Sequence, residues 1–213
     1  MPLHTTDALI LRTYKLGESD RIVVFLTRDR GKRRGVAKNA RQSRRRFGGA
    51  LEPMTCGRVQ YVERERRDLV LLEYVEVQRS PLSAADGDAL GYVSYFAELI
   101  DEWAPEADPN ESLFRLGSSV VDAICAGVPI EPLARYFEFW LLRLQGVYEP
   151  AQGVSAEARA FLASARICSP LALARVRVSP QTINELDIAH RELIEMHLEK
   201  KLRSARVLRE MRR

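Results

Sequence analysis

The sequence predicts an α+β protein in which a small N-terminal β-barrel is followed by an all-α helical domain. Short segments rich in β-branched residues fill residues 1–80, whereas apolar residues recur at helical spacing over residues 81–213. The charge changes with the pattern, because residues 1–80 hold 18 basic and 10 acidic side chains, but residues 81–190 hold 7 and 15. We therefore place the domain boundary at residue 80.

Five strands are expected in the first domain. They cover residues 7–14, 21–27, 32–38, 57–65 and 68–77. In the fourth segment Val59 and Tyr61 alternate with polar residues, which indicates one solvent-exposed face, whereas both faces of the fifth are largely apolar. Short strands of this kind with glycines at their bends predict a small barrel.

The helical domain is predicted from apolar stripes and from the residues that cap them. A first helix spans about residues 90–103, and a second begins after Asp108, which we expect to be its N-cap. A third covers about residues 131–145. Ser155 is expected to cap a shorter fourth helix, and Ser179 to start the last long helical segment.

Several classes of protein are disfavoured by what the sequence lacks. The cysteines Cys56, Cys125 and Cys168 are far apart and form no CxxC pair, so we expect neither a disulfide framework nor a bound metal. No segment approaches the roughly 18 apolar residues of a membrane helix, and the first ten residues do not follow a signal-peptide pattern. A cytoplasmic protein without membrane association is expected.

An enzymatic function is also disfavoured. The segment GKRRG lacks the first glycine of a phosphate-binding loop, and no Ser/His/Asp or Cys/His arrangement can be argued from the order of residues. His190 and His197 lie two helical turns apart with no third ligand in evidence. We therefore expect a non-enzyme that uses no cofactor.

The most basic part of the chain is GKRRGVAKNARQSRRRFGGAL, residues 31–51. Between Arg28 and Arg46 there are ten basic residues and one acid, Asp29. Such a run repels itself and needs either solvent or a polyanion. Because OB-folds place nucleic-acid contacts on the loops between barrel strands, we favour a nucleic acid over a solvated face. A membrane surface is less suitable, since the run lacks an amphipathic helix.

The candidate DNA-binding residues all lie in this run. They are Lys32, Arg33, Arg34, Lys38, Arg41, Arg44, Arg45, Arg46 and Phe47. The basic residues would neutralise phosphates, and Phe47 would stack on a base. For Tyr14 and Tyr61, base stacking and packing in the core are both open from the sequence.

The segment TDALILRTYKLGESDRIVVFLTRDRGKRRGVAKNARQSRRRFGGALEPM resembles the N-terminal barrel of the bacterial recombination mediator RecO family. The order of an opening strand, a turn at GESD and a basic AKNAR loop that ends in FGGALEP carries the resemblance. RYFEFWLLRLQG and HLEKKLRSAR are similar to helices of that family. Two departures stand out: residues 147–161 contain no cysteine where many members carry a four-cysteine zinc module, and Asn39 replaces a usual glycine. The zinc module is therefore expected to be shortened or absent.

The resemblance implies an OB-fold joined to a helical domain, and a DNA repair and homologous recombination mediator as the function. Such proteins bind single- and double-stranded DNA, anneal complementary strands and, with RecR, assist RecA loading onto strands coated with single-stranded-DNA-binding protein. It further implies association with the nucleoid and capture of the coating protein's acidic C-terminal tail. The residues expected at the tail site are Arg135, Trp140, Arg143, Lys201, Arg203 and Arg206.

Two other functions remain open from the sequence. One is an OB-type RNA chaperone or ribosome-associated factor, which competition between DNA and RNA of matched length would distinguish. The other is a helical adaptor whose basic barrel only aids solubility. Charge reversal at Arg44, Arg45 and Arg46 excludes that adaptor if it abolishes DNA binding.

Overall fold

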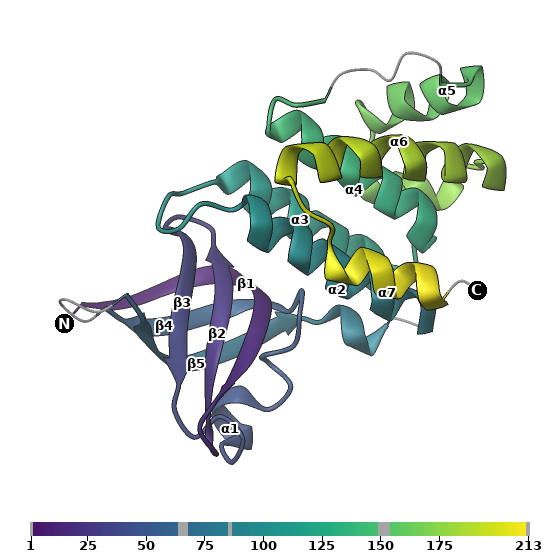
Figure 1. The fold of residues 1–213 in the computed structure, drawn as a ribbon. Coiled ribbons are helices and arrows are strands. Elements are labelled where there is room, and N and C mark those ends of the chain that lie inside the picture. The colour runs from purple at the N-terminus through teal and green to yellow at the C-terminus, as the bar shows by residue number, and fades with distance from the viewer. Residues whose placement is uncertain (1, 64–67, 85–86, 149–153, 212–213) are drawn as a thin grey trace.

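The computed structural model describes residues 2–63, 68–84, 87–148 and 154–211. A five-stranded barrel comes first and a group of packed helices follows it on one side, as Figure 1 shows. This order confirms the predicted fold class, an N-terminal OB-type barrel followed by an all-α region.

Five strands form the barrel in the order β1-β2-β3-β5-β4. Their bounds are β1 Leu3–Leu16, β2 Asp20–Thr27, β3 Gly31–Ala37, β4 Cys56–Val62 and β5 Val70–Arg79. The sheet closes because β4 pairs antiparallel with β1 and β5 pairs with β3. The β3–β5 contact is parallel and short, extending over Gly35 to Ala37 on β3.

The barrel interior is filled by alternate residues of the strands. Ile10, Phe25, Tyr61 and Leu72 are among the residues buried there. For Tyr61 the sequence left base stacking and core packing open, and its burial shows that it packs in the core.

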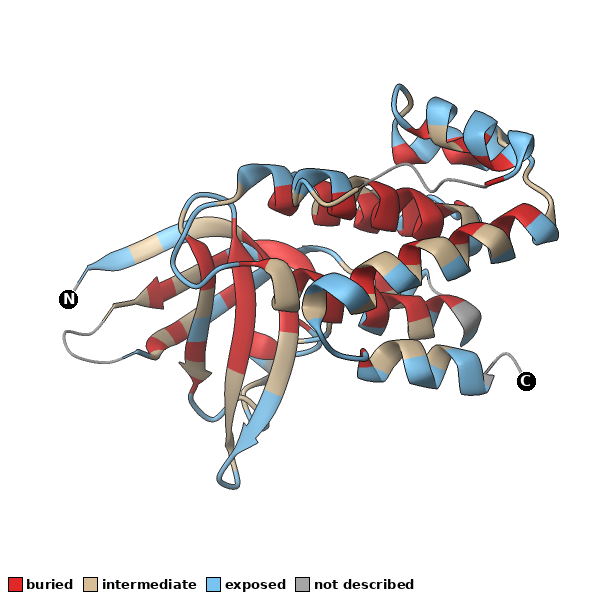
Figure 2. Cartoon of the chain, turned by 45° about the horizontal axis from the view of Figure 1, so that its top comes forward, coloured by how far each residue is buried: buried red, intermediate tan, exposed pale blue. Residues whose placement is uncertain are grey.

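The opposite face of β1 and β2 is also buried. Leu9, Leu11, Val24 and Leu26 pack into the apolar core of the helices. The helices thus cover β1 and β2, and Figure 2 shows the buried residues gathered where these strands meet them. The last four residues of β5, 76–79, are all exposed.

Six helices of eight residues or more follow the barrel in the described chain. They are α2 Gly87–Trp103, α3 Glu111–Cys125, α4 Ile130–Leu144, α5 Ala156–Ala165, α6 Pro180–Leu198 and α7 Arg203–Met211. Two 3₁₀ turns, η1 Pro81–Ser83 and η2 Pro170–Arg175, lie between them. The side chains of Ser155 and Ser179 cap α5 and α6 as predicted. Asn110, and not Asp108, caps α3, since its side chain accepts a hydrogen bond from the Leu113 N–H.

The last helical segment is divided into two helices. The chain reverses after α6 at Glu199, whose φ of 53° lies in the left-handed region that ends helices. Helix α7 then packs on α2 (Figure 1). The carboxylate of Glu98 on α2 accepts hydrogen bonds from the backbone N–H groups of Arg203 and Ser204 at 3.2 and 2.8 Å. A side chain of another helix therefore caps α7.

Candidate nucleic-acid interface

The basic run from Arg28 to Arg46 is divided by the fold into two parts with different surroundings. The first part lies on β3, beside the helices. Lys32 is only 7% exposed, and its Nζ lies 2.6 Å from the backbone oxygen of Asp101 and 3.3 Å from its carboxylate. This corrects the expectation that Lys32 contacts DNA, because its ammonium group is buried between barrel and helices and binds Asp101 there.

The close approach of β3 to the helices begins one residue earlier. Gly31 has a φ of 70°, and a Cβ built on it would lie 2.3 Å from the backbone oxygen of Asp108. Only glycine fits both the conformation and the space. This contact fixes β3 against the segment between α2 and α3.

Arg33 and Arg34 are also engaged by acids. Arg33 lies 3.4 Å from the carboxylate of Glu63, and Arg34 lies 2.9 Å from that of Glu106. Both arginines line a cleft in which these acids and Asp68 are also found. A mixed-charge cleft attracts a polyanion less than a purely basic one, so these two residues are weaker candidates than the sequence implied.

The second part of the run is a loop that follows β3, and its cations face solvent. Lys38, Arg41 and Arg45 are exposed, and Arg46 is half-buried. Within the described residues, none of the four forms an ion pair with an acid. The side chain of Arg44 lies outside the described part. Here the structure presents unneutralised positive charge.

Hydrogen bonds to the chain's own backbone hold this loop in place. Arg41 Nη1 donates to the Glu18 carbonyl oxygen at 3.0 Å, and Arg46 Nη2 donates to that of Lys38 at 2.8 Å. Asn39 adopts a left-handed φ of 53°, which asparagine tolerates, and its N–H donates to the carboxylate of Asp20. The replacement of the usual glycine therefore leaves a defined loop.

Phe47 ends a short helix, α1 Arg44–Phe47, that lies within the basic loop. Its side chain is 3% exposed and packs into the barrel core with Ala50. This corrects the expectation that Phe47 stacks on a base. The guanidinium of Arg46 lies over its ring, 5.0 Å from the centroid. Phe47 thus anchors the basic loop to the barrel.

A cleft of about 910 Å³ lies between this loop and the β1–β2 hairpin. Its walls include three arginines, Arg12, Arg21 and Arg41. Tyr14, which is 44% exposed, accepts a hydrogen bond from Arg12 at 3.2 Å. Burial alone would lower the pKa of Arg12, but Tyr14 and the carboxylate of Asp101 outweigh it and raise the pKa. Arg12 is thus a paired cation, with Asp101 at 3.4 Å and Glu98 at 3.9 Å, and Glu52 also lines the cleft. Arg21 and Arg41, which form no ion pair among the described residues, supply its free positive charge.

Sequence reasoning missed Arg12 and Arg21 as part of this surface. They stand alone in apolar strands, so a search for dense basic runs passes over them. The available signal was the period-two spacing of Arg12 and Tyr14, which places both on one face of β1.

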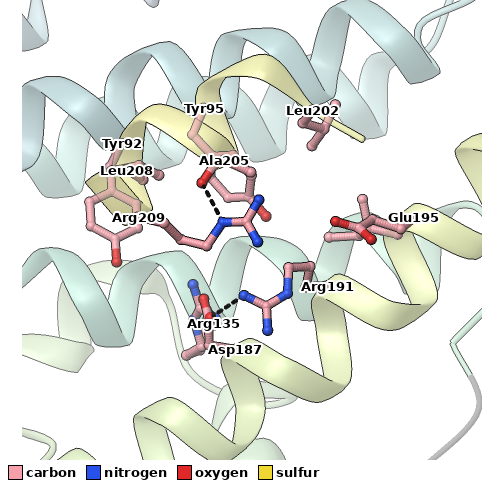
Figure 3. A pocket seen from close by; sticks show the side chains of 11 residues that line it. Tyr92, Tyr95, Arg135, Asp187, Arg191, Glu195, Leu202, Ala205, Leu208 and Arg209 are labelled. Atoms are coloured by element: carbon pink, nitrogen blue, oxygen red, sulfur yellow. Dashed lines mark hydrogen bonds and ion pairs between the residues drawn. The ribbon is translucent and has the colours of Figure 1, made fainter. Parts of the chain in front are cut away.

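The six residues expected at a tail-binding site do not come together. Arg135 is 1% exposed, and it pairs with Glu138 at 3.0 Å and with Asp187. Burial disfavours its charge, but these two carboxylates outweigh the burial and raise the pKa of Arg135. Arg135 does line the pocket shown in Figure 3, but it is buried and paired with two acids, which corrects its assignment as a free cation at a pocket rim. Arg135 belongs to a buried network, in which Glu138 also accepts a hydrogen bond from the Tyr95 hydroxyl group at 2.8 Å.

The other five residues lie on two separate surfaces. Trp140 donates to the carbonyl oxygen of Ala165 at 3.0 Å, and the guanidinium of Arg143 lies 5.7 Å from the centre of its ring. Lys201, Arg203 and Arg206 are exposed near the start of α7. None of these five lines the apolar pocket shown in Figure 3.

That pocket is formed where α7 packs against α2 and α6. Its apolar lining includes Ile194, Leu202 and Leu208. Figure 3 shows Arg191 and Arg209 in the same lining, together with the acids Asp187 and Glu195. Arg191 is held by the carboxylate of Asp187 at 3.3 Å. The pocket therefore combines an apolar lining with cations, as the sequence argument required, but of the six predicted residues its lining includes Arg135 alone.

Three further observations concern features outside these surfaces. Across the described ranges, His, Cys, Asp and Glu side chains do not gather in groups of three that could hold a metal ion. None of the described helices combines the length and the apolar character that crossing a bilayer requires. Burial raises the pKa of the Cys56 thiol to about 11, so this cysteine is protonated at neutral pH.

Comparison with known proteins places these features in a family. A family model described as "Recombination protein O N terminal" matches residues 1–81, and one described as "Recombination protein O C terminal" matches residues 84–150. The chain is 45% identical over 148 residues to a protein named DNA repair protein RecO from Koribacter versatilis. That alignment covers 68% of this chain and 59% of the relative.

Proteins of the same name from Anaeromyxobacter sp. (strain K) and Geobacter metallireducens are 43% and 40% identical. These alignments cover 65% and 66% of this chain and 55% and 57% of the relatives, so the matched region spans a little more than half of their length. The barrel, the helices that follow it and both family models agree. The chain belongs to the RecO family of DNA repair proteins.

Proposed function

We propose that this chain binds single- and double-stranded DNA through the basic loop and the adjoining barrel cleft. The observation that supports this most strongly is the exposure of Lys38, Arg41 and Arg45 without acidic partners among the described residues. Arg12 and Arg21 extend the same positive surface along the strands. Each phosphate that they neutralise releases condensed counterions, which gives affinity with little dependence on base sequence.

The activity that follows from this surface is the annealing of complementary strands. Two strands repel each other through their phosphates, and a basic surface lowers that repulsion so that base pairing can proceed. Tyr14 provides one exposed ring beside Arg12 on which a base can stack. No covalent step is needed, so the proposal is a mediator and not an enzyme.

The proposed partners are RecR, RecA and the single-stranded-DNA-binding protein, as in the recombination mediators that the chain resembles. With RecR, the chain would assist RecA loading onto strands that carry the coating protein. We place the coating protein's acidic tail at the pocket between α2, α6 and α7, because its lining brings the apolar side chains of Leu202 and Leu208 together with the cation of Arg209.

The experiment that tests the proposed function is strand annealing on complementary strands coated with their single-stranded-DNA-binding protein. We expect the chain to accelerate annealing, and competition with RNA of matched length to be weak. No acceleration contradicts the mediator role, and stronger binding of RNA favours an RNA chaperone.

The tail site has a separate test. A peptide that ends in Asp-Asp-Ile-Pro-Phe is titrated into the full chain by calorimetry, with the variants Leu208→Glu and Arg143→Glu. We expect Leu208→Glu to weaken binding at least tenfold and Arg143→Glu, outside the pocket, to leave it unchanged. The opposite ranking moves the site to the α4 surface, and absence of binding to the unmodified chain removes this partner.

A further inference from the structure

Helix α7 has a basic outer face that the proposed sites leave unused. Residues 200–213 hold seven basic side chains and one acid, the second most basic run in the chain. Lys201, Arg203 and Arg206 are exposed there. Of these, only Arg206 has an acidic partner among the described residues. It forms an ion pair with Glu210 at 3.9 Å, and both side chains of this pair are largely exposed. Such a pair contributes little and leaves the arginine available.

The two faces of α7 have different surroundings. Leu202, Ala205 and Leu208 line the pocket against α2 and α6, together with Arg209, which donates to the Ala205 carbonyl oxygen (Figure 3). The outer cations do not line it. A ligand bound in the pocket would therefore not account for the positive charge of Lys201, Arg203 and Arg206.

The outer face begins next to the DNA cleft of the barrel. Glu98 caps α7 through the N–H groups of Arg203 and Ser204, and the same carboxylate lies 3.9 Å from Arg12. Arg12 is one of the arginines that line the cleft. The carboxylate of Glu98 thus contacts both the start of α7 and Arg12, a residue of the cleft.

The acids beneath α7 are already engaged. Glu98 accepts from the backbone and the hydroxyl group of Ser204, and Glu102 pairs with Lys200. Burial alone would raise the pKa of Glu98, but the hydrogen bonds from Ser204 and Arg203 lower it. These carboxylates therefore have partners inside the protein, while the outer cations face solvent.

We propose that the outer face of α7, formed by Lys201, Arg203 and Arg206, contacts the phosphates of a second DNA strand while the barrel cleft holds the first. Charge complementarity and continuity with the cleft favour DNA as the occupant. The helix sequence RSARVLREM contains no aromatic residue, so it offers charge without a ring on which a base would stack. A strand held in this way keeps its bases free to pair. The inference rests on the proposed function and assigns the second strand a site.

The test compares two activities in three triple variants with the same change of charge. They are K201E/R203E/R206E on α7, K38E/R41E/R45E on the barrel loop, and R166E/R175E/R177E, three exposed arginines near α5 and η2. Anisotropy measures binding of a ten-nucleotide strand in dilute salt, and fluorescence energy transfer measures annealing of two longer complementary strands. Circular dichroism verifies folding, and K201Q/R203Q/R206Q provides a milder change.

We expect the α7 variant to bind the short strand within about threefold of the unmodified chain but to anneal at least tenfold more slowly. The glutamine variant should show a smaller loss in the same direction, and the distal variant none. Unchanged annealing in both α7 variants overturns the inference, as does an equal loss in the distal variant. Loss of short-strand binding in the α7 variant also overturns it, because α7 would then belong to the first site. If the unmodified chain binds no DNA, the proposed function itself has failed.

Discussion

The ammonium group of Lys32 lies 2.6 Å from the backbone carbonyl oxygen of Asp101, so a cation of the most basic segment is part of the contact between barrel and helices. Lys38, six residues later, is exposed on the loop. Both lysines belong to one basic run in the sequence, but only the second can reach a phosphate. The fold therefore places Lys32 in the contact between barrel and helices and leaves Lys38 exposed for the proposed binding of DNA.

The first prediction is that substitutions of these two lysines affect different properties, stability for Lys32 and DNA binding for Lys38. Lys32→Ala removes the buried ammonium group beside Asp101, which keeps Arg12 at 3.4 Å as a partner, and should lower the free energy of unfolding by about 1.5–3 kcal/mol. Lys38→Ala should change it by less than about 0.5 kcal/mol but weaken DNA binding. Urea denaturation and anisotropy measure the two effects. Equal stability of the two variants would show that the contact at Asp101 contributes nothing.

The second prediction concerns Phe47. Because its ring is buried in the barrel core, Phe47→Ala should destabilise the chain by about 3–5 kcal/mol. Phe47→Leu, which keeps most of the volume, should cost less than about 1.5 kcal/mol and leave DNA affinity unchanged. A loss of affinity in a folded Phe47→Leu protein would restore the stacking role that the sequence suggested.

The third prediction is a dependence on pH at Glu98. A carboxyl group with a lowered pKa stabilises the fold above its ordinary pKa of about 4.3, and this contribution is lost as the pH falls through the lower value in the folded state. The difference in unfolding free energy between the unmodified chain and Glu98→Gln should therefore be largest above pH 5 and shrink toward pH 3. A difference that stays constant over this range would contradict the role of Glu98 as an ionised cap of α7.

The fourth prediction concerns the buried network around Glu138, which bonds Arg135, Tyr95 and His190. Glu138→Ala removes the shared carboxylate and should cost about 3–5 kcal/mol. The control is Glu192→Ala, an exposed glutamate, with an expected change below about 0.5 kcal/mol. Comparable denaturation midpoints for the two variants would contradict the proposed importance of the network.

Local patterns were sufficient to predict most of the fold. The strands, the caps at Ser155 and Ser179 and the change from barrel to helices all follow from residue type and spacing within short windows. The burial of both faces of β1 was not predictable in this way, because it depends on helices that are distant in sequence.

The candidate site was predictable only in part, for the same reason. Charge density located the loop with Lys38 and Arg41, but it could not separate these from Lys32, whose partner Asp101 is 69 residues away. Likewise, the helical position of Arg135 gave no sign that Asp187 would neutralise it from α6. Tertiary contacts decide which cations are free, and sequence patterns do not show them.

The account depends most on the claim that the loop cations bind phosphates. The most direct measurement is the affinity for single-stranded DNA between about 50 and 200 mM salt, in the unmodified chain, in K38E/R41E/R45E and in the distal control R166E/R175E/R177E. Counterion release predicts at least a tenfold loss of affinity over this range, and a logarithmic salt slope shallower by about 2 in the loop variant alone. A flat dependence in the unmodified chain, or an unaltered slope in the loop variant, would contradict the account.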